Sequence, residues 1–306
     1  MKKFFIKSIL FFGLVISVIS FILFFYGGYV DYYYPKFVSP PATSLILGDS
    51  RSFQGIQPQV IDTYFKDTNL DLNVLNYSFT IVEVAYGEPY KQSIIRKLDP
   101  NTKNGIFILS VHPFVLSARD ENDNPEKNIY FETNLPPNNM QNVNLKLNVE
   151  YFFRNFDYFH FRGILRKTSE THKNGWLEET NLPDDKELLA KWKKKQIELY
   201  TGFAKKWRKS PKRLQSLDEI SKILKKYGNV FLVRLPIDKE FIELENNYWP
   251  NFDKDMQDLC YRNGLDYINF TVNNHFKTYD GIHIDKFKGV NFTNTLCDSI
   301  AANFHQ

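Results

Sequence analysis

Five short apolar runs, interleaved with segments of helical pattern, constrain the fold of this chain more than any other feature. Continuous apolar strands that alternate with helices are typical of a parallel sheet buried on both faces. The runs cover residues 45–47, 72–77, 105–111, 230–235 and 265–270, and the helical segments cover residues 59–65, 81–98, 214–227, 252–263 and 286–303. We therefore predict an α/β fold, a three-layer α/β/α sandwich with a five-stranded parallel sheet.

The alternation of strands and helices stops between residues 115 and 211. We interpret this segment as an insertion that caps the carboxyl end of the sheet, because no clear linker marks its borders. Residues 184–207 have apolar side chains at helical spacing. Residues 191–213 hold ten Lys or Arg against the single acid Glu198. This basic segment is either a solvated helix face or a patch that faces anionic lipid headgroups or an anionic glycan.

An uncharged run at residues 8–30 predicts a membrane anchor. As a helix its 23 residues would span about 35 Å, enough for a hydrocarbon core of roughly 30 Å. A cleavable signal peptide is the alternative, but the run ends in bulky residues without an Ala-x-Ala pattern, which favours an uncleaved helix. Lys2, Lys3 and Lys7 precede the run, so we expect a cytoplasmic N-terminus. The rest of the chain would then lie outside the inner membrane, in the periplasm or at the cell exterior.

The domain organisation follows from these boundaries. Residues 1–30 are expected to be the cytoplasmic N-terminus and transmembrane anchor. Residues 31–43 contain Pro35, Pro40 and Pro41 and are typical of a short stiff linker. Residues 44–306 would form one domain with the insertion at about 115–211.

Composition narrows the range of partners and cofactors. The net charge of +4 is small and no nucleic-acid-binding signature accompanies it, so no nucleic acid is expected. The two cysteines, Cys260 and Cys297, fall in predicted helices and are expected to be free and buried rather than paired. No metal-ligand spacing occurs, and we expect neither a metal nor a cofactor.

The first apolar run ends abruptly at Gly48-Asp49-Ser50. A serine in this position is held at the carboxyl end of a strand, where open α/β sheets bind ligands. Asp280-Gly281-Ile282-His283 lies just before the last predicted helix. A serine nucleophile needs a base and a carboxylate that orients the base, and one loop with Asp280 three residues before His283 can supply both. The sequence predicts a Ser50–His283–Asp280 triad.

These two motifs resemble the first and last blocks of the SGNH (GDSL-type) hydrolase superfamily, which are Gly-Asp-Ser after the first strand and Asp-x-x-His near the C-terminus. The resemblance covers residues 44–111 and 229–304, and leaves the insertion outside. It implies a flavodoxin-like fold and ester chemistry. An N-terminal anchor before such a domain is similar in arrangement to the envelope-modifying branch, which includes the teichoic acid D-alanylation protein and alginate acetylation proteins.

The resemblance also implies where an oxyanion would be bound. The backbone N–H of Ser50 would be one donor. The family has a Gly N–H after the second strand, where this chain has Ser78, with Asn76 as a rival candidate and a substrate-binding residue. The family has an Asn after the third strand, where this chain has His112. This departure leaves three interpretations: a rebuilt oxyanion hole, acyl transfer with a tuned site, or weak catalysis.

Two arginines are expected at the same edge of the sheet. Arg51 follows the candidate nucleophile, and Arg234 ends the fourth apolar run. Each is either a substrate-binding group that grips a carboxylate or phosphate, or a member of a structural ion pair with Glu243 or Glu245.

The sequence thus predicts a membrane-anchored SGNH-like serine esterase or O-acyltransferase that acts on acyl groups of a cell-envelope or secreted glycan. Its expected partners are the lipid bilayer, through the N-terminal helix, a glycan or acyl-ester substrate, and envelope acyl-transfer machinery. Two other hypotheses remain open. One is a lipid-directed esterase or thioesterase, and the other is a non-catalytic envelope assembly or glycan-binding factor.

Overall fold

The computed structural model describes residues 1–119, 122–272 and 275–304. At its centre is a five-stranded sheet of order β2-β1-β3-β8-β9, in which every neighbouring pair is parallel. This is the flavodoxin-like strand order, so the predicted fold class is confirmed. The strands are β1 (Ser44–Leu47), β2 (Val74–Asn76), β3 (Gly105–Ser110), β8 (Gly228–Arg234) and β9 (Asp266–Asn269).

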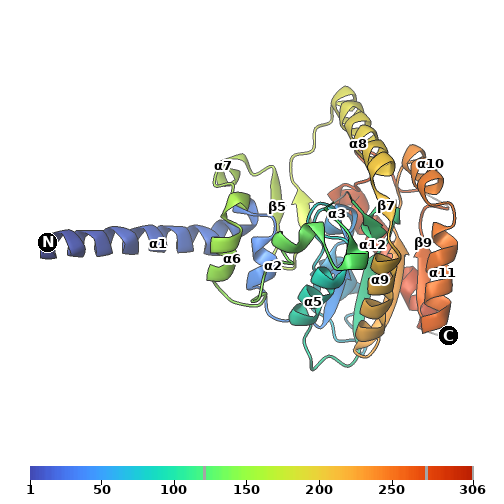
Figure 1. The fold of residues 1–306 in the computed structure, drawn as a ribbon, viewed down its shortest axis with the longest axis horizontal. Coiled ribbons are helices and arrows are strands. Elements are labelled where there is room, and N and C mark those ends of the chain that lie inside the picture. Colours follow the sequence, from blue (N-terminus) through green and yellow to red (C-terminus); the bar gives the residue numbers. More distant parts are fainter. Residues whose placement is uncertain (120–121, 273–274, 305–306) are drawn as a thin grey trace.

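Helices cover both faces of the sheet (Figure 1). Alternate residues of each strand point to opposite faces, so Leu45 and Leu47 join one buried apolar cluster while Ile46 joins another. The helices α5 (Glu88–Lys97), α9 (Pro211–Leu224) and α11 (Phe252–Asn263) pack in the first cluster, and α4 (Pro58–Tyr64) and α12 (Lys286–Asn303) pack in the second. Both faces of the sheet are therefore covered by apolar side chains, and its two charged residues, Arg234 and Asp266, stand at strand ends.

Three helices differ from the sequence-based expectation. The helix predicted at residues 81–98 begins only at Glu88, because Pro89 fits the first turn of a helix but not its interior. A short helix, α3 (Ser50–Gly55), begins at the candidate nucleophile itself. The helix α10 (Lys239–Tyr248), which follows β8, was not predicted.

The insertion begins and ends at one place. Its first residues form β4 (Ser117–Ala118), which pairs antiparallel with β7 (Arg208–Lys209) at its end. Between them lie the hairpin of β5 (Ser169–Thr171) and β6 (Leu177–Glu179), the helices α6 (Val149–Arg154), α7 (Gly163–Arg166) and α8 (Lys186–Lys206), and short 3-10 turns at Pro125–Lys127, Phe131–Asn134 and Phe156–Tyr158. A further 3-10 turn, Pro113–Leu116, precedes β4.

The N-terminal helix α1 (Lys2–Val30) is long and apolar enough to cross a membrane. Most of it projects from the domain (Figure 1), but its last turns pack into the domain and bury Leu23, Gly27 and Val30. The N–H of His160 donates a hydrogen bond to the carbonyl of Val30 at 2.6 Å. The end of α1 is thus part of the folded domain.

The prediction of a stiff linker at residues 31–43 is wrong. This segment folds into the core, where the helix α2 (Tyr34–Val38) lies. Tyr33, Tyr34 and Phe37 are buried in the same apolar cluster as the sheet. The prolines suggested an extended spacer, but the aromatic side chains near Pro35 gain more free energy by burial than the segment would gain by remaining solvated.

Both cysteines are free and buried, as predicted. Burial raises the pKa of the Cys260 and Cys297 thiols to about 12, so neither is a reactive thiolate near neutral pH.

The close approach of α1 to the insertion gives a test of this docking. A Cβ added at Gly28 would collide with the carbonyl oxygen of Thr171. Gly28→Ala should therefore destabilise the domain by roughly 1–3 kcal/mol, the usual cost of overpacking. Thermal unfolding of the full-length protein in detergent, followed by tryptophan fluorescence, measures the effect. Gly13→Ala is the matched control on the same helix, because no atom lies near that position. Equal midpoints for the two variants would contradict the docking.

Candidate functional site

The turn that presents Ser50 is built from three consecutive residues after β1. Gly48 adopts a φ of +140°, and a Cβ there would lie 2.6 Å from the Cβ of Ser110, so only glycine fits this turn. Asp49 caps α3, because its carboxylate accepts a hydrogen bond from the N–H of Arg51 at 3.2 Å. Ser50 is then the first residue of the helix, with its side chain half-buried at the carboxyl end of the sheet.

The second half of the site is the loop that carries Asp280 and His283. The Asp280 carboxylate accepts hydrogen bonds from the N–H groups of Ile282 at 3.2 Å and His283 at 3.0 Å, the arrangement of an Asx turn. Gly281 has a φ of +98°, and its Cα packs against the ring of Phe241 with no room for a side chain. The turn therefore folds Asp280 back onto the imidazole three residues later.

The two halves meet. The Nε2 atom of His283 lies 2.8 Å from the Oγ of Ser50, and its Nδ1 lies 2.8 Å from the Oδ2 of Asp280. The structure thus brings together all three residues of the predicted triad, although 230 residues separate Ser50 from Asp280. This hydrogen-bond chain has the geometry needed to move a proton from a serine to an imidazole held by a carboxylate.

Electrostatics prepare His283 to be a base. Burial alone would lower the pKa of His283, but the charge and the hydrogen bond of Asp280 outweigh it, and the pKa is raised above its usual value of 6.5. Burial would raise the pKa of Asp280, but His283 and two backbone N–H groups outweigh that effect and lower the pKa. Asp280 is therefore ionised where His283 titrates.

Ser78 and Asn76 do not point into an open site. Asn76 is fully buried, and its amide group donates hydrogen bonds to the carbonyls of Ser52 and Ile56 at 2.8 and 3.1 Å. Its side-chain oxygen accepts the N–H of Ser78 at 3.1 Å. The predictions that Asn76 binds substrate and that the Ser78 N–H binds an oxyanion therefore fail, because the Asn76 amide already holds α3 to the end of β2 and the Ser78 N–H already donates to Asn76.

His112 also has a structural partner. Its Nε2 lies 2.8 Å from the Oδ2 of Asp49, and its Nδ1 faces the Oε1 of Glu245 at 3.7 Å. Burial, together with the nearby Arg51 charge, lowers the pKa of His112 despite these carboxylates. Both ring nitrogens face buried carboxylates, so the structure does not support the prediction of His112 as an oxyanion donor. The Ser50 N–H remains as the predicted donor, since the first N–H groups of a helix have no intrahelical acceptor.

Arg51 and Arg234 form structural ion pairs with Glu245, one of the two alternatives that the sequence left open. Glu245 Oε1 lies 2.7 Å from Arg51 and its Oε2 lies 2.9 Å from Arg234. Arg234 also contacts Asp253 at 2.8 Å. Both guanidinium groups are buried, so the substrate-binding interpretation of these two residues is wrong. We call Asp49, His112, Glu245 and these two arginines the buried ion cluster.

Sequence reasoning missed three residues around the candidate triad. The Tyr279 ring stacks on the His283 ring, with 5.8 Å between the ring centres. Its hydroxyl donates a hydrogen bond to Oε1 of Gln54 at 2.7 Å. Gln196, on α8 of the insertion, donates to Asp280 Oδ2 at 3.4 Å. Burial raises the pKa of Glu179, at the end of β6, and this carboxyl is also near enough to feel the charges of Asp280 and His283. Only Tyr279, adjacent to Asp280, carries a signal in the sequence, because the other two come from the insertion.

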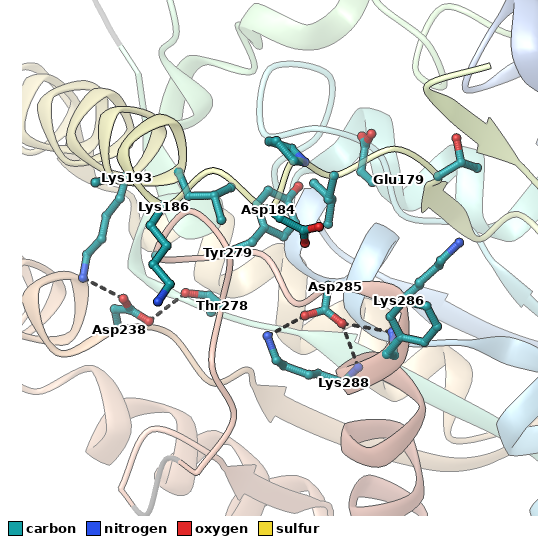
Figure 2. A pocket seen from close by; sticks show the side chains of 17 residues that line it. Glu179, Asp184, Lys186, Lys193, Asp238, Thr278, Tyr279, Asp285, Lys286 and Lys288 are labelled. Carbon is teal, nitrogen blue, oxygen red and sulfur yellow. Dashed lines mark hydrogen bonds and ion pairs between the residues drawn. The ribbon is translucent and has the colours of Figure 1, made fainter. Parts of the chain in front are cut away.

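A cavity of about 530 Å³ lies between α8, β6 and the Asp280 loop (Figure 2). Charged and polar side chains line it beside apolar ones, and Ser50, Asp280 and His283 are not among the lining residues. The polar part of the lining includes Glu179, Asp184, Lys186, Lys193, Asp238, Tyr279, Asp285, Lys286 and Lys288. Several of these charges are paired across the cavity wall, as Lys193 is with Asp238 at 2.7 Å. Residues of the insertion, from β6 and α8, therefore form one side of this cavity.

Part of the basic segment at residues 191–213 is neutralised within the domain. Arg213 is fully buried and pairs with Asp123 and Glu132 at 2.9 and 2.7 Å. Lys193 pairs with Asp238 and Glu240. Within the part of the chain that the structure describes, no group of His, Cys, Asp and Glu is arranged to hold a metal ion.

Solved structures with a similar fold include esterases. An aryl esterase from M. smegmatis overlaps with a TM-score of 0.40 at 8% identity, over 85% of this chain and 99% of that chain. A carbohydrate acetylesterase from Sinorhizobium meliloti overlaps with a TM-score of 0.39 at 9% identity, over 85% and 99%. No protein-family model and no curated protein sequence matches the chain. Overlaps this loose do not place individual residues, so the site described above rests on its own geometry.

The buried ion cluster yields a stability prediction. Glu245→Gln leaves two buried guanidinium groups without their shared countercharge, which should cost roughly 3–5 kcal/mol. Burial would raise the pKa of Glu245, but the arginines outweigh it and lower the pKa. The stabilisation is therefore present at neutral pH and is lost as the pH falls through this lowered pKa. Thermal unfolding of the full-length protein in detergent at neutral pH checks the change.

The matched control is Glu243→Gln on the same helix. Glu243 is exposed and only loosely paired with Lys239 at 3.7 Å, so this variant should change stability by less than about 1 kcal/mol. A Glu245→Gln protein as stable as the control would show that the cluster contributes little.

Proposed function

We propose that this protein is a membrane-anchored serine esterase or O-acyltransferase that acts on acyl groups of a cell-envelope or secreted glycan. The observation that carries the proposal is the Ser50–His283–Asp280 hydrogen-bond chain at the carboxyl end of a parallel sheet. The resemblance of its two motifs to those of SGNH hydrolases supports the same chemistry.

In this mechanism Ser50 attacks the ester carbonyl carbon while Nε2 of His283 takes the hydroxyl proton. Asp280 keeps the proton on Nδ1 and stabilises the imidazolium that forms. The backbone N–H of Ser50 stabilises the oxyanion. Collapse of the tetrahedral intermediate expels the alcohol, which takes the proton from His283 and leaves an acyl-Ser50 ester. Water or a sugar hydroxyl, deprotonated by His283, then attacks this ester and releases Ser50.

The surroundings of the candidate triad favour a polar substrate over a fatty acyl chain. The cavity beside the Asp280 loop is open, and charged side chains line it together with apolar ones (Figure 2), whereas a long acyl chain needs an enclosed apolar tunnel. The Trp192 ring packs edge-on to the Tyr279 ring, with 6.4 Å between the ring centres, and both side chains are partly exposed. Such aromatic faces can stack on sugar rings.

The packing of α1 supports retention of this helix as an anchor rather than its removal as a signal peptide. Cleavage near Val30 would remove Leu23 and Val30 from the core and free the N–H of His160. The apolar face of α7 would also be uncovered. With the cytoplasmic N-terminus expected from Lys2, Lys3 and Lys7, the domain would lie in the periplasm or at the cell exterior, where envelope acyl-transfer machinery operates.

A non-catalytic assembly or glycan-binding role is the second candidate. It is favoured by one observation, that Ser78 and His112 both have structural partners and do not provide oxyanion donors. Reactivity of Ser50 separates the two candidates.

Full-length protein in detergent should react with a fluorophosphonate probe at Ser50 and hydrolyse p-nitrophenyl acetate. Ser50→Ala should abolish labelling, and His283→Ala should reduce turnover by roughly 10²-fold or more, because the base is lost. His160→Ala, an exposed histidine away from the triad, is the control and should behave like the unmodified chain. Absence of labelling in folded protein would favour the non-catalytic role. Faster hydrolysis of the palmitate ester than of the acetate would favour the lipid-directed alternative.

The pH dependence of hydrolysis tests the role of Asp280. His283 must be neutral to accept a proton, so kcat/KM should rise with pH, with a midpoint above the ordinary histidine value of about 6.5 because the pKa of His283 is raised. Asp280→Asn removes the charge that raises this pKa, so the midpoint should move to lower pH while the plateau falls. The rate measured with the Ser50→Ala protein at each pH is subtracted from the rates of the other proteins, which corrects for spontaneous hydrolysis of the ester. An unmoved midpoint would contradict the assignment.

A further inference from the structure

One segment of the insertion exposes an unusual number of large apolar side chains. Scattered exposed apolar residues are normal in proteins, but a contiguous group marks an interaction surface. Within residues 145–165 the exposed fractions are 87% for Leu165, 78% for Phe153, 52% for Val149, 50% for Phe156, and 47% for both Leu145 and Leu147. We call residues 145–167 the collar.

The collar lies against the end of α1. Figure 1 shows α6 and α7 on the side of the domain from which α1 projects. The hydroxyl of Tyr151 donates to the Asp31 carboxylate at 2.9 Å, and the Nζ of Lys146 lies 5.6 Å from the centre of the Phe24 ring. The backbone at Gly163 touches the carbonyl of Tyr29 so closely that no Cβ fits. The collar therefore surrounds part of the last two turns of α1.

The length of α1 sets the depth of the collar in a membrane. A span of about 20 residues crosses the hydrocarbon core, and such a span starting after Lys7 ends near Gly27. Phe24 and Tyr29 stand on either side of this level. Side chains that contact them lie at the boundary between the acyl chains and the headgroups of the outer leaflet.

The charges of the collar match that position. Five basic residues accompany the apolar ones, against two acids, Glu150 and Asp157, and Glu150 is already paired with Arg154 at 3.0 Å. Apolar side chains mixed with Lys and Arg are typical of segments that lie in the membrane interface. The basic residues are Lys146, Arg154, Arg162, Arg166 and Lys167, all exposed.

We propose that the collar binds the outer surface of the lipid bilayer, with its apolar side chains at the acyl boundary and its basic side chains among anionic headgroups. This inference rests on the proposed anchoring by α1 and adds a second attachment beside it. Two attachments prevent the domain from swinging about the end of the helix.

The second attachment also fixes the height of Ser50 above the bilayer. Tyr33 follows α1 directly, and its ring stacks at 6.2 Å on Phe53, one turn after Ser50 in α3. The Nζ of Lys36, in α2, lies 3.5 Å from the centre of the same Phe53 ring. The short, buried path from anchor to α3 holds the candidate nucleophile at a set distance from the membrane, where a glycan attached to or leaving the membrane would be reached.

The test places a fluorophore in the collar of the full-length protein. Leu165→Cys and, as the matched control, Tyr261→Cys are each labelled with an NBD dye, in a chain whose buried cysteines are changed to alanine. Tyr261 is 89% exposed and lies on α11, on the side of the domain away from α1 (Figure 1). Both proteins are reconstituted in liposomes of phosphatidylethanolamine and phosphatidylglycerol. We expect the label at 165 to be quenched by shallow nitroxide lipids and shielded from aqueous iodide, and the label at 261 to show the reverse.

Flotation of the liposomes after a carbonate wash distinguishes the two levels of the inference. Protein that floats but carries an iodide-accessible label at 165, as at 261, would overturn the collar and leave the anchor intact. Protein that fails to float would overturn both. Neither readout depends on esterase activity, so failure of the proposed chemistry would not alter the result.

Discussion

The carboxylate of Glu245 is the interaction on which the geometry of the site depends. A buried charge is tolerated only when it is paired and hydrogen-bonded, and Glu245 pairs with one arginine after β1 and another at the end of β8. Its own helix, α10, follows β8 directly. The position of α3, and with it Ser50, is therefore coupled to β8 and α10. Separating these buried charges would cost free energy, because each would lose its partner. His112 and Asp49 extend the same cluster to the end of β3.

This cluster explains why the chain can depart from the expected oxyanion residues. After the end of β3 the chain has His112, whose ring hydrogen-bonds to Asp49, rather than an amide that faces the substrate. Likewise, the end of β2 uses Asn76 to cap the carbonyls at the end of α3. These groups hold the turn at Ser50 rigid but give up direct contact with an oxyanion. An oxyanion donor of this kind contributes roughly 10²–10³ in rate, so these groups fix the turn at Ser50 at the expense of contacts that could stabilise a transition state.

The parts of the molecule that could be predicted are those whose conformation depends on residues close together in the sequence. The largely apolar strands specify a buried parallel sheet, and the Gly48 and Gly281 turns identify where Ser50 and Asp280 are presented, because only glycine fits there. The partners of Arg51 and Arg234 could not be chosen in advance, because the competing acids Glu243 and Glu245 are two residues apart and point to opposite sides of α10. The segment at 31–43 was misjudged because prolines indicate an extended chain, whereas burial of its aromatic side chains depends on surfaces distant in sequence.

The insertion connects the two ends of the molecule that the resemblance treats separately. Near its middle it packs on the end of α1, through Tyr151 and Gly163, and at its far end α8 reaches the candidate triad, through Gln196 to Asp280. The ring of Tyr200, on the same helix, faces Arg51 of the buried ion cluster, with 5.3 Å between the guanidinium carbon and the ring centre. Because β4 pairs with β7 in a separate two-stranded sheet, the segment that makes both contacts leaves and rejoins the rest of the domain at one place.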